Sequence, residues 1–267
     1  MSVQAIPAGF ARPRTGRFKA GGLLWTLVRT DFKTRYHGTI GGFVWALLKP
    51  MTMFVVLMGV FSFVFNSDPL YKINLILGLF LWDFFAESTK LGLVSLHAKS
   101  YLLTKARFPS WILVVTSSSN ALITLSIFSV AMVLFVSATS GAPSPLELAL
   151  YVTYVLALML IVSGISLAGS VLFLRYRDLN QIWEVIIQAG FFLAPVIYPL
   201  KIVPERFQFY LYVWPPTPII QFSRAVLVDH APPTLRAHLL LALMTAAIVG
   251  TGLAIFRRYA PRAAEYL

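Results

Sequence analysis

The chain has 267 residues, of which 58% are hydrophobic and only 12% are charged, and its formal net charge is +12. An ordinary soluble domain carries roughly 25% charged residues, so this chain has too little polar surface for a water-soluble particle, and its excess apolar surface is expected to face lipid. The absence of cysteine excludes a disulfide framework and a thiolate metal site.

The N-terminal region is predicted to lie outside the membrane. Residues 1–21 lack the pattern of a removable signal peptide and are expected to form a flexible cytoplasmic N-terminus. Residues 22–38 are predicted to form an amphipathic helix, because apolar side chains recur at every fourth position, at Leu24, Val28, Phe32 and Tyr36. This stretch is too short and too charged to cross a bilayer, so it is expected to lie in the cytoplasmic interface. A helix packed on a soluble domain is the alternative.

Six apolar runs are long enough to cross a membrane, which requires about 20 mostly apolar residues. They lie at residues 43–65, 73–96, 111–137, 146–174, 182–200 and 239–256. The connections between them are too short for a further soluble domain. The sequence therefore predicts an all-α membrane protein with a single transmembrane domain at residues 39–258 and a short tail at residues 259–267.

The basic residues predict the orientation. They concentrate before the first span, between the second and third, between the fourth and fifth, and after the sixth. The positive-inside rule places these segments, and with them both termini, in the cytoplasm. Topology and anionic lipid headgroups also account for the net positive charge, so nucleic acid is not expected as a partner.

The second predicted span carries three ionisable residues. The spacing of Asp83, Glu87 and Lys90 puts them on one helical face, and ionisable groups at this depth face the protein interior or water. One interpretation is a hydrated translocation path. A second is an internal ion pair between Glu87 and Lys90 that only positions helices, and a third is a proton relay. The sequence leaves these three interpretations open.

A short basic segment at residues 98–109 has an apolar core flanked by cations. A connection between two spans does not need this pattern, which is typical of a short helix that docks into the groove of a partner. The alternative is a cationic turn whose side chains reach the membrane interface.

The segment at residues 201–238 is rich in proline and aromatic residues. Proline does not sustain one continuous helix, so two short helices are predicted, separated near Trp214, Pro215 and Pro216. Non-helical backbone at membrane depth is tolerated where protein shields it or where it lines water. This extracytoplasmic segment is therefore expected to form a gate over a pore exit, with a simple aromatic belt at the interface as the alternative.

The sequence offers no motif for catalysis, for a cofactor or for a metal. It contains no G-x-x-x-x-G-K-S/T loop, so the chain is not expected to bind ATP itself. No paired-histidine spacing suggests a metal site, and the scattered histidines are more typical of structural positions. The chain is therefore not expected to be an enzyme.

Four motifs stand in a specific order along the chain. They are TDFKTRY at residues 30–36 leading to WALLKP at 45–50, LWDFF at 81–85, LLTKARFP at 102–109, and RYRDL at 175–179 followed by FLAPVIY at 192–198. Each is weak alone, but together the chain resembles the ABC-2 type permeases that export cell-surface polysaccharides such as O-antigen, capsule and teichoic acid. The resemblance extends from about residue 22 to residue 258.

The resemblance implies a function and a set of partners. Such permeases have an N-terminal interfacial helix, six spans and short extracytoplasmic gate helices before the last span, and they lie in the cytoplasmic (inner) membrane of bacteria. They form homodimers that bind two copies of a cytoplasmic ABC ATPase, which holds the ATP and Mg. The expected function is export of a lipid-linked polysaccharide. The alternatives are an ABC-2 exporter of a drug or other small molecule and a proton-coupled transporter.

The resemblance also implies roles for individual residues. The coupling helix that sits in the ATPase groove corresponds to Ser100, Tyr101, Leu102, Leu103, Thr104, Lys105, Ala106, Arg107 and Phe108. The turn with Arg175, Arg177 and Asp178 is expected to contact the same partner. Family members often carry isoleucine and lysine where this chain has Leu103 and Thr104, and many carry proline near Val115, so individual coupling contacts stay open.

A channel at the dimer axis is expected to be lined mainly by the first, second and fifth spans. The residues predicted to line the channel or gate are Trp45, Asp83, Phe84, Phe85, Glu87, Lys90, Trp183, Phe191, Tyr198 and Trp214. Six of the aromatic residues are expected to stack on sugar rings, with packing against lipid or other helices as the alternative: Trp45, Phe84, Phe85, Trp183, Phe191 and Tyr198. The interfacial cations Arg29, Lys33 and Arg35 are expected to receive the pyrophosphate of the lipid carrier.

Overall fold

The computed structural model describes residues 20–38, 41–65, 70–105, 109–139 and 141–261. These residues contain helices and no strand, which confirms the prediction of an all-helical chain. In chain order the elements are α1 (Ala20–Tyr36), α2 (Val44–Phe61), α3 (Tyr71–Ala98), α4 (Ser100–Lys105), α5 (Trp111–Ser117), α6 (Ser119–Thr139), α7 (Pro145–Arg175), α8 (Leu179–Leu193), η1 (Leu200–Ile202), α9 (Glu205–Val213), α10 (Pro216–Leu227) and α11 (Leu235–Tyr259).

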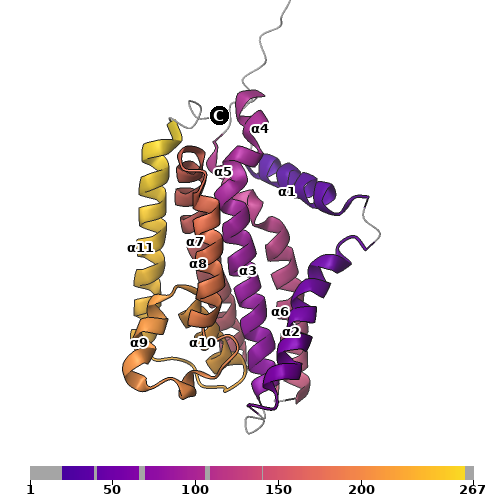
Figure 1. Ribbon diagram of the computed structural model, residues 1–267. Coiled ribbons are helices and arrows are strands. Elements are labelled where there is room, and N and C mark those ends of the chain that lie inside the picture. The colour runs from indigo at the N-terminus through magenta and orange to yellow at the C-terminus, as the bar shows by residue number, and fades with distance from the viewer. Residues whose placement is uncertain (1–19, 39–40, 66–69, 106–108, 140, 262–267) are drawn as a thin grey trace, which may run out of the picture.

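The long helices run side by side in one bundle (Figure 1). One end carries α4 and the end of α11, and we call it the α4 end. The opposite end carries α9 and α10, and we call it the α10 end. Figure 1 shows α1 lying across the bundle at the α4 end, which is the arrangement expected of a helix in a membrane interface.

Within the described residues, four helical stretches are long and apolar enough to cross a membrane. They are α2, the run Trp111–Ala138 formed by α5 and α6, α7, and α11. Helix α3 has 28 residues but carries Asp83, Glu87 and Lys90 in its middle turns. The predicted count of six spans requires α3 and α8 in addition to these four.

Helix α8 is shorter than the predicted fifth span at residues 182–200. It ends at Leu193, and Ala194 is extended with a ψ of 127°. The cause is Pro195, because a proline disfavours helical geometry in the residue before it. With 15 residues, α8 is about 22 Å long, which is less than the roughly 30 Å of a bilayer's hydrocarbon core.

The third predicted span is interrupted at Ser118, between α5 and α6. Thr116 and Ser118 donate side-chain hydrogen bonds to the carbonyls of Ile112 and Val115 one turn earlier, at 2.9 and 3.0 Å. Hydroxyls that bond back to the helix in this way tend to bend it, so the interruption follows from the local sequence.

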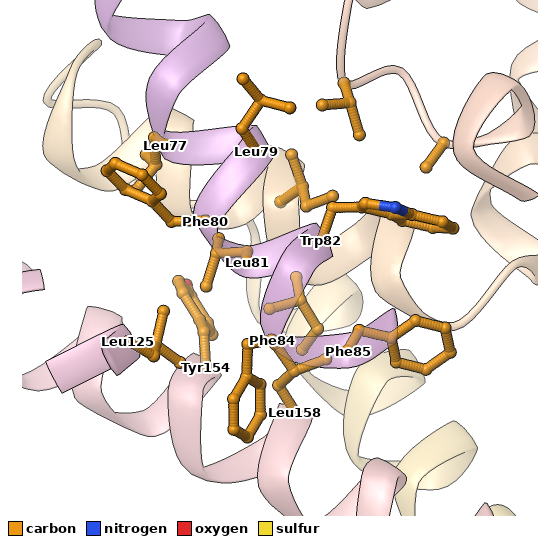
Figure 2. Close-up of a cluster of buried hydrophobic side chains, with 14 of the residues drawn as sticks. Leu77, Leu79, Phe80, Leu81, Trp82, Phe84, Phe85, Leu125, Tyr154 and Leu158 are labelled. Atoms are coloured by element: carbon orange, nitrogen blue, oxygen red, sulfur yellow. The ribbon is translucent and has the colours of Figure 1, made fainter. Parts of the chain in front are cut away.

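Helix α3 is the centre of the bundle and packs against α2, α5, α6, α7, α8 and α10. Its Leu81 and Phe85 are completely buried, and Phe80 stacks on Phe128 of α6 with ring centroids 3.7 Å apart. Figure 2 shows Tyr154 and Leu158 of α7 beside the labelled α3 side chains. The charged middle of α3 is thus surrounded by other helices rather than by lipid alone.

Helices α7 and α11 approach each other backbone to backbone. A Cβ added to Gly164 would lie 2.9 Å from the carbonyl oxygen of Ile248, and one added to Gly252 would collide with the carbonyl oxygen of Gly164. Small residues allow this kind of close contact between membrane helices, so the two glycines set the distance between α7 and α11.

Helix α10 is inserted into the bundle against α3 and α7. Its Arg224 is 6% exposed and donates hydrogen bonds to the carbonyl oxygens of Asn74 in α3 and of Pro195 and Val196 after α8, at 2.6 to 2.9 Å. Buried cations require such partners. Arg224 therefore ties α10 to α3 and to the segment that follows α8.

A second apolar cluster lies at the α4 end. It joins Leu27 of α1, Leu96 of α3, Ile112 of α5, Leu174 of α7 and Phe256 of α11, and Leu102 of α4 packs against it. The packing of Leu102 therefore connects α4 to these helices.

Candidate functional site

Two ion pairs join the first two helices to α3. Arg35 of α1 is paired with Glu87, and Lys49 of α2 lies 3.5 Å from Asp83. The four side chains are between 21% and 70% exposed, so the pairs lie at the rim of the bundle rather than in its core.

Two more ion pairs involve α3 or the residue that follows it. Lys90 lies 3.8 Å from Glu184 of α8, and Lys99 is paired with Asp31 of α1. The predicted internal pair between Glu87 and Lys90 is therefore wrong, because each residue meets an opposite charge on a neighbouring helix. The charges hold α1, α2 and α8 around α3.

We expect Glu87→Arg to destabilise the bundle by about 1–3 kcal/mol, because it sets like charges against each other at a partly buried contact. The double variant Arg35→Glu, Glu87→Arg is expected to recover most of the loss. Lys90→Glu is the matched control with a smaller effect, since its pair with Glu184 is 39% and 44% exposed. Thermal unfolding of the purified protein in detergent ranks the stabilities of the three variants. A double variant as unstable as Glu87→Arg alone would contradict the pairing of Arg35 with Glu87.

A groove of about 860 Å³ runs between α2, α3 and α8. Apolar and aromatic side chains form most of its wall, with Lys49, Thr52, Asp83 and Gln188 as its polar members. Trp82 of α3 and Phe191 of α8 both line the groove, with ring centroids 5.6 Å apart. The three helices are those predicted to line the channel.

The structure divides the predicted channel aromatics into two groups. Trp45 is 62% exposed on the groove wall, and Phe191 lines the same groove. Phe84 and Phe85 are 3% and 0% exposed inside the bundle, so they pack against other helices, and their contact with a substrate stays a prediction. They face the core because α3 is covered on that side by other helices.

Trp183, Tyr198 and Trp214 are half-buried and hold α8 and its continuation in place. Trp183 donates from Nε1 to Thr89 Oγ1 of α3 at 3.1 Å, and Tyr198 donates to the carbonyl of Phe192 at 2.9 Å. Trp214 packs on Gly190 of α8. These contacts give the three aromatics a structural role, whereas their contact with a substrate stays a prediction.

A smaller pocket of about 230 Å³ lies where α1 meets the groove, and we call it the vestibule. Arg35, Trp45, Lys49 and Glu87 line it, and it shares Trp45 and Lys49 with the groove. Burial raises the pKa of the Tyr36 phenol, which also lines this pocket, while Arg35 opposes the shift and Glu87 adds to it. Of the predicted pyrophosphate ligands only Arg35 lies here, and Arg29 and Lys33 are exposed elsewhere on α1.

The predicted coupling helix begins at Ser100 and continues to Lys105 as α4. Tyr101 is 57% exposed, whereas Leu102 packs against the second apolar cluster. Residues 103–105 are described by their backbone, and Ala106, Arg107 and Phe108 lie outside the described residues. The segment thus presents the ring of Tyr101 outward and packs the side chain of Leu102 inward.

The turn predicted to share the ATPase contact lies at the same end of the bundle. Arg175, Arg177 and Asp178 are all exposed. The ring of Phe173, just before this turn, lies 5.9 Å from that of His97 at the end of α3, close to the start of α4. The structure therefore brings the two predicted coupling segments together.

The sequence did not predict the contacts of two further residues that are candidates for function, Arg224 and Lys49. Arg224 stands in a segment that was interpreted as a gate, and its signal was the polar series Thr217, Gln221 and Arg224 at helical spacing. Lys49 stands in an apolar run, where a lysine requires a counter-charge, and the structure supplies that charge as Asp83. Within the described ranges, no cluster of three His, Asp or Glu side chains is arranged to hold a metal ion.

The sequence is similar to those of known membrane permeases. The chain is 27% identical over 248 residues to the O-antigen export system permease protein RfbA of Myxococcus xanthus, with 88% of this chain and 91% of the relative covered. It is 26% identical to the RfbA permease of Klebsiella pneumoniae, covering 92% and 95%. It is 22% identical to the polysialic acid transport protein KpsM of Escherichia coli, covering 85% and 89%. The sequence model of the ABC-2 type transporter matches residues 22–228, and the chain therefore belongs to the ABC-2 type transporter family.

Proposed function

We propose that this chain is the membrane-spanning permease subunit of an ATP-driven exporter that moves a lipid-linked cell-surface polysaccharide across the cytoplasmic membrane. The observation that carries the proposal is the aromatic groove between α2, α3 and α8. Relatives that cover most of the chain are named as permeases for O-antigen export and as a polysialic acid transporter.

The groove suits a polymer that must slide. Trp45, Trp82, Phe191 and Phe192 line it with aromatic surface, and an aromatic ring accepts the apolar face of a sugar without fixing its register. A wall with few hydrogen-bonding groups holds no single sugar tightly. It therefore offers contact along a chain of sugars without trapping one of them.

Two copies of the chain are proposed to place their grooves face to face and enclose the channel. Six helical spans per copy follow if α3 and α8 cross together with the four long apolar helices. Residues 194–199 then complete the crossing that α8 leaves short, since non-helical backbone is tolerated where protein shields it. Ala194, Val196 and Ile197 are buried, which supports this assignment. Both termini are proposed to lie on the cytoplasmic side, in accord with the basic α4 end.

Energy is proposed to come from two copies of a separate ATPase that holds ATP and Mg²⁺. Its groove would take α4, with Tyr101 as the outward anchor and the turn at Arg175, Arg177 and Asp178 beside it. Leu102 supports this mechanism, because its packing on the second apolar cluster connects α4 to α1, α3, α5, α7 and α11. This chain itself then performs no chemical reaction.

The lipid carrier is proposed to approach along α1. The exposed Arg29 and Lys33 would meet its phosphates at the membrane surface. Arg35 would then bind the phosphates at the vestibule, which lies between α1 and the groove. The three cations thus act in sequence rather than as one cluster.

Deletion of the gene in its natural host is expected to abolish the surface polysaccharide while the lipid-linked polymer accumulates inside. Complementation with Tyr101→Glu is expected to lower export at least tenfold, because a charge replaces an aromatic anchor in an apolar groove. The control is Phe209→Glu on α9, an exposed aromatic at the opposite end, which should export normally. Surface polysaccharide is quantified by extraction and gel staining. Unchanged surface polysaccharide in the deletion strain would reject the function and favour a small-molecule substrate.

A further inference from the structure

A separate pocket of about 420 Å³ lies at the α10 end of the bundle. Its walls come from the first turns of α3, from residues 196–201, from α9 and from α10. Its volume falls within the roughly 300–1,000 Å³ that is typical of small-molecule sites. It lies beyond the aromatic groove on the same helix, since Leu75 lines this pocket and Leu79, one turn further along α3, lines the groove.

Two amide side chains in its wall have unused hydrogen-bonding groups. Asn74 Oδ1 and Gln221 Nε2 are buried and have no partner within the described residues. An unpaired buried polar group costs about 1–3 kcal/mol, so such groups are kept where a ligand or water satisfies them. One is an acceptor and the other is a donor, and they stand on two different helices, α3 and α10.

An aromatic side chain completes the wall. Tyr212 of α9 lines the pocket, and its ring lies 6.4 Å from that of Phe222 in α10. Burial raises the pKa of the Tyr212 phenol, so the group stays neutral and keeps its hydroxyl as both donor and acceptor. A flat ring beside an acceptor and a donor offers a sugar one apolar face and two polar contacts.

We propose that this pocket binds a sugar residue of the polysaccharide as the polymer leaves the groove. A sugar hydroxyl both donates and accepts, so it matches Asn74 Oδ1 and Gln221 Nε2 together, while Tyr212 covers the apolar face of the ring. Arg224 is a positioning residue, because it holds α10 against α3 through the carbonyl of Asn74. The inference rests on the proposed function and assigns it an extracytoplasmic sugar subsite.

The role of these two polar groups in export can be tested separately from their effect on stability. Asn74→Leu and Gln221→Leu each replace an unpaired polar group with an apolar one of similar size, so the melting temperature should stay the same or rise. Export should fall about fivefold or more, measured as new surface polymer after a pulse of synthesis. A purely structural role would lower both quantities together, and unchanged export in both variants would overturn the proposal.

Contact with sugar can be tested by photo-crosslinking in cells. Replacing Tyr212 with benzoylphenylalanine should give, on illumination, an adduct that stains for oxidised glycan. The same replacement at Phe209, which is 71% exposed on the same helix, is the control and should give none. The adduct should vanish in cells that make no polymer and weaken in the Asn74→Leu background. The absence of an adduct in a strain with normal export would contradict the sugar subsite but not the proposed function. Normal surface polysaccharide in the deletion strain would contradict the proposed function itself.

Discussion

Arg224→Leu is expected to cause one of the largest losses of stability of any single substitution in this chain. The guanidinium donates from Nη1 to the carbonyl of Pro195 at 2.6 Å and from Nη2 to those of Asn74 and Val196 at 2.7 and 2.9 Å. Hydrogen bonds from a charged donor contribute about 1.5–3 kcal/mol each, and orphaned buried carbonyls add a penalty. The total loss is expected to be about 4 kcal/mol or more.

The measurement is thermal unfolding in detergent, followed by the fluorescence of the six tryptophans. Arg224→Lys should be intermediate, because a single ammonium does not reproduce the planar fork that reaches three carbonyls. Arg206→Leu is the control, since Arg206 is exposed on α9 with its guanidinium 4.8 Å from the ring of Phe207. A melting temperature of Arg224→Leu equal to that of Arg206→Leu would show that α10 does not depend on the hydrogen bonds.

Gly252→Ala is the second substitution with a large expected effect. The new Cβ would meet the backbone carbonyl of Gly164, and a backbone atom cannot rotate away as a flexible side chain can. Helices α7 and α11 must then separate, at a cost of about 3 kcal/mol or more, since overpacking typically costs 1–3 kcal/mol even where side chains can adjust.

Gly250 provides a matched control two residues earlier on the same helix. A Cβ added there meets nothing within 4 Å, so Gly250→Ala should be neutral or stabilising by up to about 1 kcal/mol through helix propensity. The two alanine variants are compared by thermal unfolding and by the yield of monodisperse protein in size-exclusion chromatography. Equal stability of the two would mean that α7 and α11 are not packed backbone to backbone.

Local features of the chain were predictable because they depend on neighbouring residues. The prolines at 215 and 216 predicted the division between α9 and α10, which the structure contains. The end of α8 was misplaced, although Pro195 marked it by the same rule. The apolar run continues past that proline, so hydropathy alone extended the predicted helix to residue 200.

The ion pairs were not predictable, because they join residues far apart in the chain. The spacing of Glu87 and Lys90 suggested a pair within one helix. In the structure, Glu87 pairs with Arg35 of α1 and Lys90 pairs with Glu184 of α8. In the same way, Phe85 was expected at a channel and lies in the core. Sequence spacing groups residues on one face of a helix, but it does not say what that face meets.

The sequence by itself determined an all-helical membrane chain and its family resemblance, because these follow from composition and local order. Only the tertiary structure decided which helix faces form the groove, the vestibule and the α10-end pocket. The physical reason is that lipid is as apolar as a protein core. A helix in such surroundings is hydrophobic all round, so its pattern does not reveal which side is inside. The rotation of each helix is set instead by close packing, as at Gly164 and Gly252, and by long-range polar contacts such as those of Arg224.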